Sequence, residues 1–166
     1  IRGKSWGTRL SEFALYELAV GGGRVALCPA PGASGDYGAD LRIIRAWKPA
    51  LVLSMTSVSE LKACGAETFA RDIAQDGVDW LHIPVPDFGV PAGLDWAPLH
   101  ARLTAHFAQG DGVLFHCKGG CGRSGMLVLR AMISSGEAPE AALTRLRRIR
   151  PCAVETQAQL DWASQG

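Results

Sequence analysis

Residues 114–129, "LFHCKGGCGRSGMLVL", decide which fold class this chain adopts. An apolar run stops at the pair His116–Cys117, a polar stretch rich in glycine follows, and apolar residues then resume. This order predicts a buried strand, a tight loop and a buried helix, which together form the repeating unit of α/β proteins. Ligands of such proteins bind beyond the carboxyl ends of the strands, which is where Cys117 would lie.

The rest of the chain alternates between strands and helices in the same way. Apolar runs bounded by glycine and proline predict strands, and stretches with helical spacing separate them. The expected fold class is therefore α/β, with a central, mostly parallel sheet flanked by helices in one domain of residues 1–166. The expected strands span 24–28, 50–55, 78–85 and 112–117, and the expected helices span 12–23, 39–49, 57–65, 66–77, 94–110, 124–136 and 138–151.

The composition argues against several classes of partner. The chain has 166 residues, and its net charge of +1 gives no reason to expect a nucleic-acid partner. No apolar run approaches the ~20 residues that span a bilayer, and the first residues lack the apolar core of a signal peptide. The five cysteines are widely spaced and odd in number, which argues against a disulfide framework and favours a reducing cytoplasm. The oligomeric state is not predicted.

The glycine-rich loop after Cys117 has the composition of an anion site. Glycines adopt backbone angles that can turn successive amide N–H groups inward, and the N-terminus of the following helix adds further N–H donors. The planar guanidinium of Arg123 suits two oxygens of a phosphate. The loop therefore predicts a site for an oxyanion such as phosphate, formed by Lys118, Gly119, Gly120, Cys121, Gly122 and Arg123.

Cys117 would lie at the bottom of this positively charged loop. Inward amides, the helix end and Arg123 all favour the thiolate over the thiol. A thiolate that faces a bound phosphorus atom is placed for nucleophilic attack. Ser124 can donate a hydrogen bond to the sulfur and ease its later departure. The loop differs from the ATP-binding phosphate loop, which requires Gly-Lys followed by Ser or Thr.

The segment "HCKGGCGRS", residues 116–124, resembles the signature of the cysteine-dependent protein phosphatases, which reads His-Cys, five residues, Arg, then Ser or Thr. Within that superfamily the chain looks most like the small dual-specificity group, and particularly the cyclin-dependent-kinase-associated phosphatases. The likeness covers roughly residues 80–162. It implies a phosphatase that uses no cofactor or metal and acts on a phosphorylated protein or another phosphomonoester through a phosphocysteine intermediate. The leading expectation is hydrolysis of phosphotyrosine, with phosphoserine and phosphothreonine as further candidate substrates.

The resemblance also implies a general acid on a separate loop. The segment "PVPDFGVP", residues 84–91, resembles that loop, with Asp87 as the acid. A carboxyl group there can protonate the leaving oxygen and then serve as the base for water. Asp95 and Asp79 are the competing candidates, but Asp95 is better explained as a helix cap and Asp79 falls within a strand pattern.

A later segment, "CAVETQAQ", residues 152–159, resembles the one that positions the hydrolytic water in this family. Gln159 aligns with the second glutamine of that segment, and Glu155 occupies the position of the first. Which of these two residues holds the water stays open. His116 is expected to orient the loop from behind, and not to act as the base.

Three other functions remain open. The substrate could be a phosphoinositide or a smaller phosphate ester. A catalytically silent phosphopeptide-binding module would use the same loop, but it would not need Cys117, Ser124 and an acid together. A thiol redox protein could use Cys117 and Cys121, although their spacing differs from the common redox motif. The arginines of the last predicted helix indicate only a solvated face whose cations favour its C-terminal end.

Overall fold

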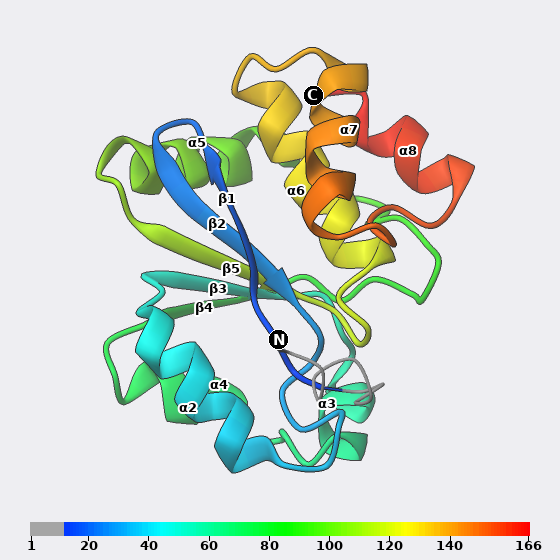
Figure 1. Ribbon diagram of the computed structural model, residues 1–166. Helices are drawn as coiled ribbons and strands as arrows, with labels where there is room; N and C mark the ends of the chain where they lie inside the picture. Colours follow the sequence, from blue (N-terminus) through cyan, green and yellow to red (C-terminus); the bar gives the residue numbers. More distant parts are fainter. Residues whose placement is uncertain (1–11) are drawn as a thin grey trace, which may run out of the picture.

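A five-stranded sheet runs through the middle of the protein, whose computed structural model describes residues 12–166 (Figure 1). The strand order is β1-β2-β5-β3-β4. Strands β1 and β2 pair antiparallel and the other three pairings are parallel, so the predicted mostly parallel sheet is confirmed. The strands are β1 (Tyr16–Val20), β2 (Gly23–Cys28), β3 (Leu51–Ser54), β4 (Asp79–His82) and β5 (Gly112–His116).

Helices cover both faces of the sheet, with α2, α3 and α4 on one face and α5 to α8 on the other (Figure 1). No helix in the described part of the chain has both the length and the apolar composition needed to cross a bilayer. The helices are α2 (Tyr37–Trp47), α3 (Val58–Ala63), α4 (Phe69–Ala74), α5 (Trp96–Ala108), α6 (Gly122–Ser134), α7 (Pro139–Ile149) and α8 (Gln157–Ala163).

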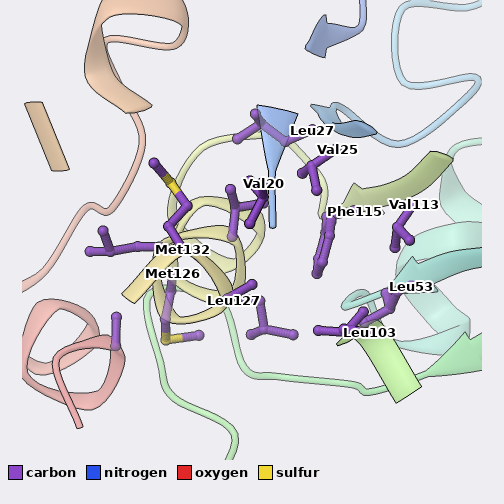
Figure 2. Close-up of a cluster of buried hydrophobic side chains, with 14 of the residues drawn as sticks. Val20, Val25, Leu27, Leu53, Leu103, Val113, Phe115, Met126, Leu127 and Met132 are labelled. Atoms are coloured by element: carbon purple, nitrogen blue, oxygen red, sulfur yellow. The ribbon is translucent and has the colours of Figure 1, made fainter. Parts of the chain in front are cut away.

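The central strands are buried on both faces, as parallel strands between two helical layers must be. In β5, Val113 and Phe115 pack towards α5 to α8 (Figure 2). Leu114 packs towards the opposite layer. Helix α6 is buried along its whole length from Gly122 to Ile133, as its continuous apolar sequence predicts. The loop between β5 and α6 is therefore held at both ends by the core.

The expected helix over residues 12–23 is wrong. Residues Tyr16–Val20 form the edge strand β1, in which alternate side chains towards the end of the strand are buried. Gly21 and Gly22 connect it to β2 with φ angles of 57° and 89°. Two consecutive positive φ angles match a tight hairpin turn, which suits the twist of paired strands. The glycines therefore form a turn between strands and do not end a helix.

The sequence interpretation also missed helix α8, which begins after Thr156. The side chain of Thr156 accepts a hydrogen bond from the N–H of Gln159, and the side chain of Gln159 accepts one from the N–H of Thr156. This capping box was readable as Thr-x-x-Gln in the sequence. Helix α8 packs against α6 and brings the segment before it to the start of α6.

Candidate active site

Cys117 follows β5 directly and begins the loop that leads into α6. Its side chain is only 3% exposed, and its Sγ lies 3.3 Å from the Oγ of Ser124 in the first turn of α6. Ser124 is fully buried, so its hydroxyl stays against the sulfur. In this geometry the serine O–H can donate to a cysteine thiolate.

Two glycines allow the loop to follow this path. Gly120 has a φ of 71°, and a Cβ at this position would collide with the backbone of Cys28 and Pro29. A Cβ at Gly122 would collide with the carboxylate of Glu155. The first glycine lets the loop pack against the end of β2, and the second lets Glu155 approach the start of α6.

Arg150 holds the loop from outside. Its Nε donates to the carbonyl of Gly120 at 3.1 Å and its Nη2 donates to the carbonyl of Gly119 at 2.8 Å. The described chain contains no cis peptide bond, and a trans peptide directs its N–H opposite to its C=O. The N–H groups of Gly120 and Cys121 therefore point away from Arg150. For this arginine, the expectation of a merely solvated side chain is wrong.

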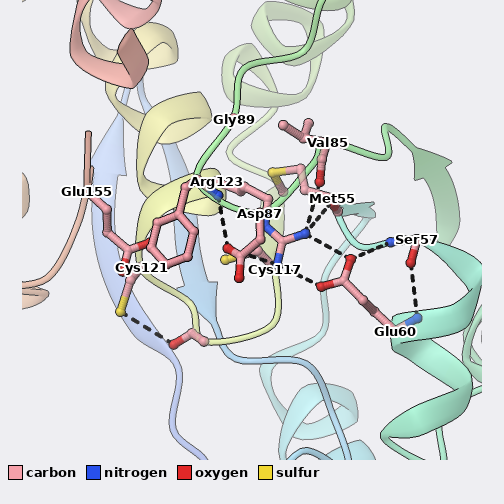
Figure 3. Close-up of polar contacts among 12 residues, drawn as sticks. Met55, Ser57, Glu60, Val85, Asp87, Gly89, Cys117, Cys121, Arg123 and Glu155 are labelled. Atoms are coloured by element: carbon pink, nitrogen blue, oxygen red, sulfur yellow. Dashed lines mark hydrogen bonds and ion pairs between the residues drawn. The ribbon is translucent and has the colours of Figure 1, made fainter. Parts of the chain in front are cut away.

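Arg123 is 2% exposed and is held by a carboxylate from another helix. Its Nη1 and Nη2 donate to the two carboxylate oxygens of Glu60, each at 2.9 Å, and Nη1 also donates to the carbonyl of Val85 at 3.0 Å (Figure 3). Burial opposes the charged form most strongly, but the hydrogen bonds to Glu60 and the nearby negative charges together outweigh it, so the pKa of Arg123 is raised. The guanidinium therefore stays charged in a fixed orientation.

In the sequence, Glu60 is only one residue of the expected helix over residues 57–65. A capping box starts this helix, because Glu60 and Ser57 exchange hydrogen bonds between their side chains and backbone N–H groups. The same carboxylate also holds Arg123, and these hydrogen bonds lower the pKa of Glu60 to about 2. The two partners lie 63 residues apart, so no local sequence pattern could have indicated the contact.

His116 is fully buried, and this burial lowers its pKa to about 4. The Nε1 of Trp80 donates to the Oγ of Ser54 at 2.8 Å, and this Oγ lies 2.5 Å from the Nε2 of His116. We assign the O–H of Ser54 as the donor to the Nε2 of His116. The proton of the neutral ring is then on Nδ1, which donates to the carbonyl of Cys117 at 3.1 Å. A neutral His116 thus holds the backbone at the start of the loop and does not contact the sulfur.

Asp87 lies on the loop between β4 and α5, and its side chain is 52% exposed. Its Oδ1 accepts the N–H of Phe88 at 3.1 Å and lies 3.4 Å from the Nη2 of Arg123 (Figure 3). Phe88 has a φ of 64°. A bulky residue rarely adopts this conformation, and such strain concentrates at functional loops.

The two competing aspartates lie elsewhere. Asp95 occupies the N-cap position of α5, as expected, although its side chain makes no hydrogen bond to the helix. Asp79 pairs with Arg102 at the start of β4. Neither aspartate lines the cavity that Asp87 shares with Cys117.

A cavity of about 350 Å³ brings most of the predicted site residues together. The candidate nucleophile, the candidate acid and most of the predicted phosphate-binding loop line it. Arg123 and Ser124 are buried at the start of α6, and His116 is buried at the end of β5. The lining residues are Ala33, Asp87, Phe88, Cys117, Lys118, Gly119, Cys121, Gly122 and Glu155.

Gln159 and Glu155 lie close together but differ in how they are used. The Oε1 of Gln159 accepts the N–H groups of Glu155 at 2.9 Å and Thr156 at 3.3 Å, and its Nε2 donates to the carbonyl of Gly89 at 3.1 Å. Gln159 therefore ties the Asp87 loop to the start of α8. The carboxylate of Glu155 lines the cavity and makes no hydrogen bond within residues 12–166.

The expected absence of disulfides is wrong for one pair of cysteines. Cys121 and Cys152 form a disulfide that joins the loop to the segment between α7 and α8. Wide spacing in the sequence did not prevent this bond, because α7 returns the chain to the start of α6, where the two Cα atoms lie 5.1 Å apart. Cys117 remains a free thiol.

Residues 52–137 match a family model described as "Polymorphic toxin system, DSP-PTPase phosphatase". Protein tyrosine phosphatase type IVA 3 of Mus musculus is 30% identical over 131 residues, an alignment that covers 70% of this chain and 74% of the relative. The human protein of the same name is 29% identical over 131 residues, with the same shares covered.

Solved structures of phosphatases share the fold. Kinase associated phosphatase, in a form whose catalytic-site cysteine is replaced by serine, has a TM-score of 0.80 at 20% identity, and the alignment covers 94% of each chain. Tk-PTP in its active form has a TM-score of 0.70 at 29% identity, covering 90% of this chain and 95% of the other. The relatives and the fold therefore agree with the resemblance carried by residues 116–124.

Proposed function

Because the chain belongs to the DSP-PTPase phosphatases and is thus a cysteine-dependent protein phosphatase, we propose that it hydrolyses phosphotyrosine in proteins through a phosphocysteine intermediate. Phosphoserine and phosphothreonine are further candidate substrates. The observation that carries this proposal is the cavity shared by Cys117 and Asp87, with the charged side chain of Arg123 next to both.

In the first step the thiolate of Cys117 attacks phosphorus. The S–P bond forms while the bond from phosphorus to the tyrosyl oxygen breaks, and the electron pair of the broken bond stays on that oxygen. Asp87 donates a proton to it. A phosphoryl group beside Arg123 competes with Asp87 for the guanidinium, which releases the carboxyl group towards the leaving oxygen.

Oriented donors stabilise the transferring phosphoryl group. The Nε of Arg123 is buried and has no protein partner within residues 12–166, so it can donate to a phosphoryl oxygen while Glu60 holds the two Nη groups. The N–H groups of Gly120 and Cys121 point away from Arg150 and add donors for the same anion. Helix α6 begins at the end of the loop, and its N-terminus also favours negative charge.

An aryl phosphate suits the mouth of the cavity. Phe88 is 58% exposed and lines the cavity beside Asp87, so its ring can pack against the ring of phosphotyrosine. Lys118 lies exposed at the same mouth and favours acidic residues next to the phosphotyrosine. These two side chains support a phosphorylated protein as the partner.

The proposal is tested with a panel of phosphopeptides, phosphoinositides and a simple aryl phosphate, each assayed with the wild-type protein and with Cys117→Ser. We expect the wild type to hydrolyse the aryl phosphate and the phosphotyrosine peptides. Cys117→Ser should abolish turnover but still bind tungstate, because the loop amides and Arg123 form the anion site. Turnover of Cys117→Ser near the wild-type rate would contradict the proposal.

The same panel separates the alternatives. Preferential turnover of phosphoinositides would favour a lipid phosphatase, and phosphopeptide binding without turnover would favour a silent binding module. The disulfide of Cys121 with Cys152 counts against a redox function that pairs Cys121 with Cys117.

The cytoplasm stays the predicted compartment. Because a reducing compartment disfavours disulfides, the redox state of the Cys121–Cys152 pair in cells tests that prediction.

A further inference from the structure

We propose that Glu155 is a catalytic residue that accepts a proton from the water that hydrolyses phosphocysteine. The inference rests on the proposed function, which forms this intermediate. The water oxygen attacks phosphorus, the S–P bond breaks, and its electron pair returns to the sulfur of Cys117. One water proton passes to the carboxylate of Glu155 and then to solvent. The other stays on the hydrogen phosphate that leaves.

The carboxylate of Glu155 lies close to the reacting atoms. It lines the same cavity as Cys117, and a Cβ on Gly122 would collide with its Oε1, so the carboxylate lies directly against the first residue of α6. In Figure 3, Glu155 and Glu60 lie on opposite sides of Cys117. Glu60 is bonded to Arg123, whereas Glu155 has no hydrogen-bond partner within residues 12–166.

The backbone before Glu155 is held in place by three independent contacts. The disulfide of Cys152 joins the segment to Cys121 in the loop. The N–H of Val154 donates to the carbonyl of Cys121 at 3.3 Å. The guanidinium of Arg147 donates to the carbonyl of Val154 at 2.8 Å. These contacts fix the position of the Glu155 backbone relative to the loop. A proton acceptor requires such a fixed position.

The other candidate bases near the cavity are less suited to this step. Both the oxygen and the nitrogen of the Gln159 amide already make hydrogen bonds, and an amide does not accept a proton at neutral pH. Asp87, the base that the resemblance implies, already accepts the N–H of Phe88 with its Oδ1 at 3.1 Å, whereas neither carboxylate oxygen of Glu155 accepts a hydrogen bond within residues 12–166. Glu60 is bonded to the same guanidinium, which lowers its pKa to about 2. Glu155 is the carboxylate in the cavity that carries none of these contacts.

An ionised Glu155 also has a cost, because it repels the phosphate dianion that the loop binds. The inference therefore predicts that Glu155→Gln, which keeps the shape and removes the charge, changes binding and hydrolysis in opposite directions. Oxyanion binding should become tighter, and hydrolysis of phosphocysteine should become slower. A merely structural defect would weaken both.

The test is rapid mixing of an aryl phosphate with the wild-type protein and with Glu155→Gln. We expect the variant to release one aryl alcohol per Cys117 in a first phase at least as fast as in the wild type. The steady rate that follows should fall by about 10²-fold, the lower range for general-base catalysis. Mass spectrometry after acid quenching should find phosphorylated Cys117 in the variant, and titration with tungstate should show several-fold tighter binding.

Glu67→Gln is the matched control, because Glu67 is exposed on the connection between α3 and α4 and does not line the cavity. It should leave both phases and tungstate binding unchanged. A wild-type steady rate in Glu155→Gln would show the inference wrong. So would an equal loss of both phases, or weaker tungstate binding. In each of these cases the proposed function would stand, whereas a wild-type protein that cannot release the aryl alcohol would overturn the proposed function itself.

Discussion

Asp87 is positioned by groups on both sides of the cavity. Its Oδ1 lies 3.4 Å from the Nη2 of Arg123, and the loop that carries it is attached to the start of α8. This attachment consists of hydrogen bonds from Gln159 to the carbonyl of Gly89 at 3.1 Å and from Thr156 to the carbonyl of Phe88 at 3.4 Å. The carboxyl group is therefore held at the cavity while its side chain stays half exposed to an incoming substrate.

Replacing Asp87 by alanine should affect substrates according to their leaving groups. A tyrosyl oxygen needs a proton as it leaves, whereas a nitrophenolate leaves readily without one. We expect Asp87→Ala to lower kcat on phosphotyrosine peptides by about 10²–10⁴-fold, or roughly 3–5 kcal/mol of barrier, and to lower it much less on nitrophenyl phosphate. Steady-state kinetics on the two substrates, side by side, measure the difference.

Asp95→Ala is the control for this experiment. Asp95 lies exposed at the start of α5, outside the cavity, so its removal should leave kcat unchanged on both substrates. If the leaving-group dependence appeared in Asp95→Ala and not in Asp87→Ala, the acid would have been assigned to the wrong aspartate.

At the residue scale, the sequence predicted the groups that belong to one local motif. Cys117, Arg123 and Ser124 lie within one loop and one helical turn, so their spacing was enough to place them together. Glu60 was placed only within the expected helix over residues 57–65. Its contact with Arg123 depends on how α3 packs beside the end of the sheet, which no pattern within α3 encodes.

At the scale of elements, the errors came from signals with two physical explanations. A pair of glycines after an apolar stretch can end a helix or turn a hairpin, and Gly21 and Gly22 do the second. The central strands and most helices were predicted correctly because burial on both faces, or clear helical spacing, left one explanation. The disulfide of Cys121 with Cys152 could not be predicted, because it depends on the path of α7.

Helix α7 supports the loop through the residue that follows it, Arg150. We expect Arg150→Met to weaken tungstate binding and raise KM by about tenfold, or ~1.4 kcal/mol, because the carbonyls of Gly119 and Gly120 lose their donors and the amides lose their orientation. The kcat should fall less, because the nucleophile and the acid stay in place. Titration with tungstate and steady-state kinetics provide the two measurements.

Arg148→Met tests whether this effect is specific. Arg148 lies on the same helix, is exposed and makes no hydrogen bond within residues 12–166, so the substitution removes the same charge without touching the loop. It should leave KM unchanged. An equal rise of KM in both variants would mean that general positive charge attracts the substrate and that Arg150 does not orient the loop.

At the scale of the whole molecule, the site lies where the two helical layers meet at the carboxyl ends of the parallel strands. Glu60 comes from the layer of α2 to α4, Glu155 from the layer of α5 to α8, and Cys117 follows the strand between them. In the sheet, His116 is paired in register with Cys28 on one side and Ser54 on the other. Groups that position the site, such as His116 and Glu60, therefore also stabilise the packing of the two helical layers on the sheet.

This shared role predicts a stability that falls in acid in two steps. The pKa of His116 is about 4 in the folded protein and ~6.5 when unfolded. Its contribution to the free energy of unfolding is therefore complete above pH 6.5 and is lost as the pH falls towards 4. That loss is on the order of 3 kcal/mol. The pKa of Glu60 is about 2 when folded, against an ordinary value of 4.5, so its contribution is lost as the pH falls from 4.5 towards 2.

Urea unfolding, followed by tryptophan fluorescence at a series of pH values, measures both steps. Glu60→Gln should be less stable than the wild type at neutral pH, because Arg123 loses its charged partner, and should lose the part of the pH dependence between 4.5 and 2 that Glu60 contributes. It should keep the fall between pH 6.5 and 4, because His116 and its contacts with Ser54 and Cys117 are unchanged. A wild-type stability that stays constant from pH 6.5 to 4 would show that His116 does not stay neutral in the fold, and the hydrogen-bond assignment from Trp80 to the loop would then be wrong.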